Sequence, residues 1–260
     1  MRKTIFFILF CFCIISNLHA ENFCENIDIQ WLEKHAPFPG NAEIISKKQV
    51  FGLCEVIVLI NTDPVSLYCG NDFFISGRMF KNNEAITSKT VESLAERINQ
   101  RKKEADDKEK AEADKRLLFF KQNTDKLKEF TAFEFGSLNP EKRVFVVTDP
   151  DCSHCKHILM WLRENAEEMK IRVGTIIYPL MGDESRDMAA KAVCNDFGIS
   201  EYLEMKYDSK PYICEKSQSF FMRQESFFEN ANLKFIPYIV DSECTWSVEG
   251  ADIEALKEKL

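Results

Sequence analysis

The residues best suited to chemistry are Cys152 and Cys155, which lie three positions apart in the run Cys-Ser-His-Cys. The two residues between them are Ser153 and His154. The pair follows a β-prone run at 144–148 and opens a stretch with helical spacing of apolar residues. Cysteines at positions i and i+3 share a helix face and are close enough to form a disulfide. A thiolate at the helix N-terminus is stabilised by unpaired N–H groups, so the pattern predicts Cys152 as nucleophile and Cys155 as resolving thiol.

Other kinds of site also use closely spaced cysteines. A purely structural disulfide would close a loop too short to stabilise the chain much. A zinc site needs further ligands, and His157 could supply one, but no second Cys-x-x-Cys is present. Covalent haem attachment is excluded because Lys156 stands where that motif requires histidine. We therefore expect redox chemistry without metal or cofactor, with the structural bridge and zinc as the alternatives.

The first twenty residues predict export. Arg2 and Lys3 precede an apolar run at 4–15, and Ala20 is a small residue suited to a cleavage site. This apolar run is shorter than the roughly 20 residues that a membrane span needs. We expect a cleaved signal peptide at 1–20 and a periplasmic location, with an uncleaved anchor as the alternative.

The remaining cysteines are expected to form disulfides, because the chain is exported and their number is even. Removal of the signal peptide takes two of the ten cysteines and leaves eight. Cys54 and Cys69 flank a predicted turn at 61–64 almost symmetrically, which makes them a candidate cross-strand disulfide. The alternative is that both are buried free thiols. Cys24 and Cys244 could pair with each other, pair with another chain, or stay free.

The elements that must position these residues fall into three blocks. Residues 21–87 read as a small antiparallel sheet, too small to be stable without a partner surface. Residues 88–126 read as a charged helix, interpreted as a rigid linker, with a solvated surface helix as the alternative. Residues 127–260 alternate strands and helices, which predicts a layered α/β domain. The formal net charge of −8 gives no electrostatic support to a nucleic-acid partner.

On these residues the chain resembles the DsbC/DsbG family of periplasmic thiol:disulfide interchange proteins, whose catalytic domain has a thioredoxin fold. The resemblance is carried by five segments: 144–149 leading into Cys152–Cys155, Tyr178-Pro179-Leu180, Ile236-Pro237, the pair Cys194 and Cys214, and 74–80 in the first block. The resemblance implies an α+β chain with an N-terminal dimerisation domain at 21–87, a helical linker at 88–126 and a thioredoxin-like domain with a helical insertion at 127–260.

The same resemblance implies roles for individual residues. Cys194 and Cys214 would form a structural disulfide, and Ile236 and Pro237 would contact the substrate backbone beside a cis-proline. The activity would be disulfide isomerisation or reduction of misfolded exported proteins, with chaperone activity, by a homodimer that a membrane reductant resembling DsbD keeps reduced.

Three departures from the family bear on this expectation. The residues between the cysteines, Ser153 and His154, look more like the Pro-His of the oxidant DsbA than the Gly-Tyr of the isomerases. Ile236 stands where the family usually has threonine, and the charged helix is longer than the family's linker. The alternatives are therefore a DsbA-like dithiol oxidase served by an oxidant resembling DsbB, and a non-catalytic chaperone or adaptor with a redox-sensing cysteine pair.

Overall fold

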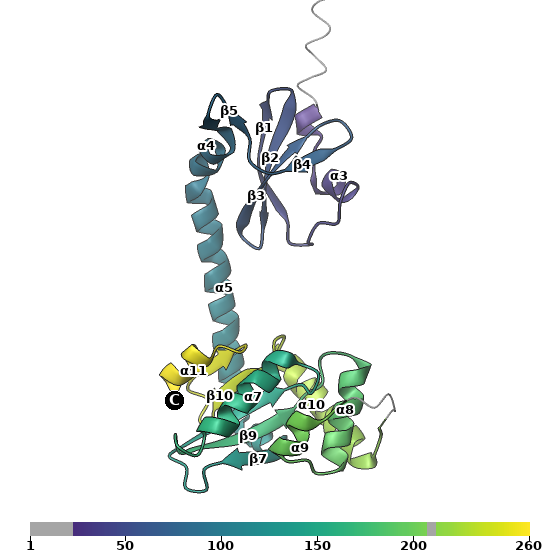
Figure 1. The fold of residues 1–260 in the computed structure, drawn as a ribbon, viewed down its shortest axis with the longest axis vertical. Coiled ribbons are helices and arrows are strands. Elements are labelled where there is room, and N and C mark those ends of the chain that lie inside the picture. Colours follow the sequence, from purple (N-terminus) through teal and green to yellow (C-terminus); the bar gives the residue numbers. More distant parts are fainter. Residues whose placement is uncertain (1–22, 207–211) are drawn as a thin grey trace, which may run out of the picture. The chain divides into compact units, whose positions relative to one another are not determined.

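The computed structural model describes residues 23–206 and 212–260, so the predicted signal peptide at 1–20 lies outside the described residues (Figure 1). The described chain forms two compact units that divide between Glu109 and Lys110. Each unit is described by itself below.

The first unit contains a four-stranded antiparallel sheet in the order β1-β2-β3-β4. Its elements are α3 (Ile29–Glu33), β1 (Glu43–Val50), β2 (Leu53–Ile60), β3 (Asp63–Cys69), β4 (Phe74–Ser76), β5 (Phe80–Lys81), β6 (Glu84–Ala85) and α4 (Ile86–Ser93). The predicted turn near 61–64 is tighter than expected, because Asn61 and Thr62 alone make it with φ values of 50° and 71°. A second turn at Phe51 and Gly52, with φ values of 50° and 83°, divides the β-prone run of 49–60. Paired left-handed residues are typical of two-residue hairpin turns.

Strand β2 is buried on both faces, and apart from Glu55 its sequence is apolar. On one face Val56 and Val58 pack with Ile27 and Leu32 of the N-terminal segment. On the other face Ile57 and Leu59 pack with Ile45 and with Ile98, which lies near the start of α5 (Ala95–Gln122). The small sheet is therefore covered by segments that precede and follow it in the chain.

Helix α5 is 28 residues long, about 42 Å at the usual rise per residue. Residues 103–111 are exposed on all sides, as expected for the charged segment. Arg116, which the sequence placed in the same solvated segment, is buried instead. Its guanidinium pairs with Glu249 and donates to the carbonyl oxygen of Asn232 at 3.1 and 3.3 Å. The charge pattern alone could not distinguish this anchored arginine from its solvated neighbours.

The second unit is built on a five-stranded sheet in the order β11-β10-β8-β9-β7. Strands β8 and β9 are parallel and the other pairs are antiparallel. Its further elements are α6 (Thr124–Glu129), β7 (Phe133–Gly136), β8 (Lys142–Thr148), α7 (Ser153–Asn165), β9 (Ile171–Ile177), α8 (Asp183–Cys194), α9 (Ile199–Glu204), α10 (Glu215–Asn230), β10 (Tyr238–Asp241), β11 (Ser247–Glu249) and α11 (Ile253–Lys259). This is a thioredoxin-like arrangement with a helical insertion between β9 and β10, so the predicted α+β fold class is confirmed (Figure 1).

Alternate residues of β8 serve two separate cores. Val144 and Val146 face a core that includes Ile158 and Leu162 of α7. Phe145 and Val147 face the opposite side, an aromatic core whose largest members include Phe120, Phe130, Phe228 and Tyr238. With both faces covered, β8 is fixed in register, and its last residue sets the position of the Cys-Ser-His-Cys turn.

Candidate active site

Cys152 caps the N-terminus of α7. Its backbone is extended (φ −84°, ψ 113°), and its Sγ accepts a hydrogen bond from the backbone N–H of Cys155 at 3.2 Å. Cys152 is buried, with 6% of the residue exposed. A sulfur that receives an otherwise unpaired N–H at the positive end of a helix is well placed to carry negative charge.

Cys155 lies one turn further along α7 and is fully buried. Burial raises the pKa of the Cys155 thiol far above its ordinary value, and the neighbouring Cys152 raises it further. Both cysteines are free thiols in the structure. The pair is therefore chemically asymmetric, with one sulfur at the helix cap and a protonated thiol behind it.

A buried tyrosine, Tyr202, lies next to the two cysteines. Tyr202 of α9 lies within hydrogen-bond distance of Thr148, with 3.3 Å between the two hydroxyl oxygens. Burial raises the pKa of the Tyr202 phenol well above its ordinary value. Tyr202 therefore remains a neutral hydroxyl beside the thiol pair.

Asp149 connects the cysteine turn to the segment after β9. Its carboxylate is completely buried and accepts hydrogen bonds from the N–H of Asp151 at 2.8 Å and from the N–H groups of Leu180 and Met181 at 2.6 and 3.0 Å. The hydroxyl of Ser185 in α8 donates a fourth bond at 2.6 Å. The sequence did not indicate these bonds of Asp149, because no spacing rule marks a carboxylate whose partners are mostly backbone groups.

The other predicted site residues have different surroundings. Ser153 and His154 are exposed in the first turn of α7. The peptide bond between Ile236 and Pro237 is cis, and Pro237 is buried while Ile236 is partly exposed. Because Tyr238 pairs with Val147, Pro237 lies at the end of the sheet where β8 leads into the cysteine turn.

Exposed apolar side chains occur on the segments that border this end of the sheet. Phe235, directly before Ile236, is 65% exposed. Leu180 and Met181 are also exposed, although Asp149 holds their backbone. Large apolar side chains exposed together on a soluble domain are typical of binding surfaces for apolar chains.

Within the described residues, the cysteines form two disulfides. Cys194 and Cys214 are bonded with Cα atoms 6.2 Å apart, which ties the end of α8 to the N-cap of α10. The other joins Cys24 to Cys54, with Cα atoms 5.2 Å apart.

The predicted Cys54–Cys69 disulfide is therefore wrong. The register behind it is as expected, because Cys54 and Cys69 are direct partners on β2 and β3. However, the N-terminal segment packs over the same face of the sheet and brings Cys24 to Cys54. That segment carries no strand signal, so no sequence pattern favoured Cys24 as the partner.

Cys69 and Cys244 remain as buried free thiols. Burial raises the pKa of each thiol to about 11. Both therefore behave as small apolar residues at neutral pH. Among the described residues, no group of three or more histidine, cysteine, aspartate or glutamate side chains is placed to hold a metal ion.

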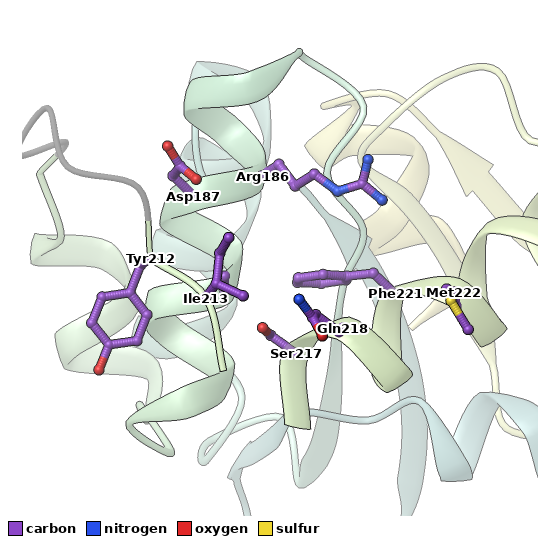
Figure 2. A pocket seen from close by; sticks show the side chains of 9 residues that line it. Arg186, Asp187, Tyr212, Ile213, Ser217, Gln218, Phe221 and Met222 are labelled. Atoms are coloured by element: carbon purple, nitrogen blue, oxygen red, sulfur yellow. The ribbon is translucent and has the colours of Figure 1, made fainter. Parts of the chain in front are cut away.

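A pocket of about 350 Å³ lies in the helical insertion (Figure 2). Arg186 and Asp187 of α8 line one side, and Phe221 and Met222 of α10 line another. Ile213, from the segment before α10, is exposed at its edge. Sequence analysis did not detect this pocket, because its walls come from helices far apart in the chain and neither has a distinctive motif.

Solved structures of similar fold include thiol–disulfide proteins of bacteria. A linker-deleted variant of Proteus mirabilis ScsC is 16% identical, covering 69% of this chain and 96% of its own, with a TM-score of 0.47. Helicobacter pylori DsbG is 21% identical, covering 82% and 98%, with a TM-score of 0.38. A periplasmic thioredoxin-like protein from Salmonella enterica serovar Typhimurium is 16% identical, covering 48% and 85%, with a TM-score of 0.35.

No family model and no curated protein sequence matches this chain. Within residues 23–206 and 212–260, no helix has both the length and the apolar composition needed to cross a bilayer.

Proposed function

We propose that this protein is an exported thiol:disulfide interchange enzyme of the periplasm, which isomerises or reduces wrong disulfides in misfolded proteins. The observation that carries the proposal is the Cys152 sulfur at the N-cap of α7, bonded to the N–H of Cys155. A cysteine sulfur at a helix N-cap, backed by a buried second thiol, is the arrangement that thiol–disulfide exchange uses.

The reaction begins when the Cys152 thiolate attacks one sulfur of a substrate disulfide. A Cys152–substrate disulfide forms, and the other substrate sulfur leaves as a thiolate. In isomerisation a second substrate thiolate attacks the substrate sulfur of this mixed disulfide, which forms a new substrate disulfide and restores the Cys152 thiolate. No electrons are gained or lost overall.

In reduction Cys155 completes the exchange instead. Its sulfur attacks Cys152, the Cys152–Cys155 disulfide forms, and the substrate leaves as a thiol with the Cys155 proton. The raised pKa of Cys155 makes this step slow until the proton has an acceptor, which leaves time for isomerisation. A membrane thiol reductant resembling DsbD would return two electrons to the oxidised pair.

The first unit is proposed to serve dimerisation, joined to the catalytic unit through the helical linker at 88–126. Support comes from large apolar side chains left exposed on this unit, two of which, Phe73 and Ile75, lie at the sheet edge formed by β4. The exposed side chains are Phe51, Phe73, Ile75 and Phe80. An open sheet edge with exposed apolar residues is a common surface for pairing with a second chain.

Rescue of scrambled ribonuclease tests the proposal. We expect the full chain to restore ribonuclease activity and Cys152→Ala to abolish it. Cys244→Ala is the matched control, since it removes a buried free thiol of the same unit and should leave rescue intact. Rescue that survives Cys152→Ala would instead indicate a chaperone or adaptor without thiol chemistry.

The exposed His154 beside Cys152 favours one competing function, a DsbA-like oxidase. That reading predicts rapid oxidation of a reduced peptide and no ribonuclease rescue. Thiol alkylation in intact cells separates the two. The isomerase requires the Cys152–Cys155 pair to be mainly reduced, whereas the oxidase requires it to be mainly oxidised.

A further inference from the structure

Asp149 holds a buried negative charge whose hydrogen-bond partners in the described chain are all uncharged. Three are backbone N–H groups and one is the Ser185 hydroxyl. Burying a carboxylate is costly, and several short bonds to the charged group offset the cost. An apolar residue would fill the same space at a lower free-energy cost. We therefore attribute the presence of the carboxylate to the two segments that its hydrogen bonds join.

Those segments are the cysteine turn and the segment 178–182. On the cysteine side, the carbonyl oxygen of Asp149 accepts the N–H of Cys152 at 3.2 Å, and its carboxylate accepts the N–H of Asp151. On the other side, a single carboxylate oxygen accepts the N–H groups of Leu180 and Met181. One residue therefore fixes the nucleophile's backbone and the segment beside it.

The segment 178–182 is held at both ends as well. The N–H of Tyr178 donates to the carbonyl of Thr148 at 2.8 Å, and Gly182 makes the turn into α8 with φ of 100°. Although this backbone is fixed, the side chains of Leu180 and Met181 are 39% and 55% exposed. Apolar side chains exposed on an ordered backbone can bind without an additional ordering cost.

We propose that Asp149 is a positioning residue that sets the substrate specificity of the thiol site. It holds Leu180 and Met181 as a fixed apolar lip beside Cys152, and the lip binds the chain next to the disulfide under attack. The substrate class is therefore peptide disulfides flanked by apolar residues, which misfolded proteins expose. This inference rests on the proposed function, because it concerns the same cysteine.

The test compares three disulfides that differ in the groups available to contact Leu180 and Met181. They are a peptide disulfide flanked by leucine and phenylalanine, the same peptide with serine flanks, and the small aromatic disulfide 5,5′-dithiobis(2-nitrobenzoate). The last has no peptide chain, so its rate reports the reactivity of the thiol site rather than binding to the lip. The two peptides are measured with excess reduced glutathione, which re-reduces the Cys152–Cys155 pair after each turnover, and the small disulfide is measured as a single reaction with the reduced protein. All are measured on the full chain as wild type, Asp149→Asn, and the surface double variant Leu180→Ser/Met181→Ser.

We expect both variants to raise KM for the apolar-flanked peptide about tenfold, the scale at which a lost apolar contact affects specificity. For the double variant, the kcat value and the rate with the small disulfide should stay within about twofold, since these report the sulfur rather than the lip. The serine-flanked peptide should react equally with the wild type and the double variant. For Asp149→Asn, the rate with the apolar-flanked peptide should fall more than the rate with the small disulfide, because its carboxylate holds both the cysteine turn and the lip. Substitution of a residue that only stabilised the fold would change the rates with all three disulfides by the same factor.

An unchanged KM for the apolar-flanked peptide in the double variant would overturn the proposal, even if Asp149→Asn failed to fold. Equal losses with the small disulfide and the peptide in Asp149→Asn would also overturn it, because Asp149 would then act on Cys152 directly. Failure of the proposed function looks different, since the wild-type protein would then turn over neither peptide disulfide, whatever its thiols do with the small disulfide.

Discussion

Replacing Thr90 by valine should destabilise the first unit by about 2 kcal/mol, the usual worth of a hydrogen bond to a charged group. Glu55, on β2, is 1% exposed, and its two carboxylate oxygens accept bonds from Tyr68 at 2.8 Å and Thr90 at 2.7 Å. Thr90 lies in α4, so its bond attaches the helix before α5 to the sheet. Valine has nearly the shape of threonine, so the change removes the donor and leaves a buried carboxylate oxygen unpaired.

The measurement needs a probe confined to the first unit. Trp31 packs against its core, whereas Trp161 and Trp246 belong to the second unit. Urea unfolding is therefore followed by Trp31 fluorescence in a Trp161→Phe/Trp246→Phe background. The matched control is Thr90→Ser, which keeps the hydroxyl and should cost clearly less than Thr90→Val. A loss below about 0.5 kcal/mol for Thr90→Val would refute the reasoning, since that is the scale of surface substitutions.

Two further predictions concern the second unit. In reduced protein at neutral pH, iodoacetamide should modify Cys152 in a Cys155→Ser variant at least about tenfold faster than Cys155 in a Cys152→Ser variant, because burial raises the pKa of Cys155 and keeps it protonated. Equal rates by peptide mass mapping would contradict this asymmetry. Removing the Cys194–Cys214 disulfide by a double serine substitution should lower stability by about 3 kcal/mol, the entropy of a loop near 20 residues. Unchanged urea unfolding of the second unit would count against it.

Much of the fold could be predicted from local sequence patterns. The β-prone run at 144–148 indicated a strand, and Cys152 could be placed at a helix N-terminus because that strand ends just before it. The turn near 61–64 placed Cys54 and Cys69 on adjacent strands, either opposite or diagonal to each other, and the structure makes them direct partners. These features depend on residues close together in the chain.

The features that sequence reasoning missed depend on distant segments. Cys24 reaches Cys54 because an N-terminal segment without strand signal folds over the sheet. Arg116 is buried by Glu249, more than a hundred residues away. Asp149 binds backbone N–H groups near residue 180, and backbone groups leave no signature in a sequence. In each case tertiary packing, and not the local sequence pattern, determines which residue is the partner.

Trapping the mixed disulfide tests the central claim most directly. Full-length Cys155→Ser protein is mixed with a peptide disulfide, quenched by alkylation and mapped by mass spectrometry without reduction. We predict that the peptide accumulates on Cys152, because the thiol that would release it is missing, and that Cys152→Ser protein carries no peptide. Absence of an adduct on Cys152, or an adduct on another cysteine instead, would contradict the assignment of Cys152 as the nucleophile.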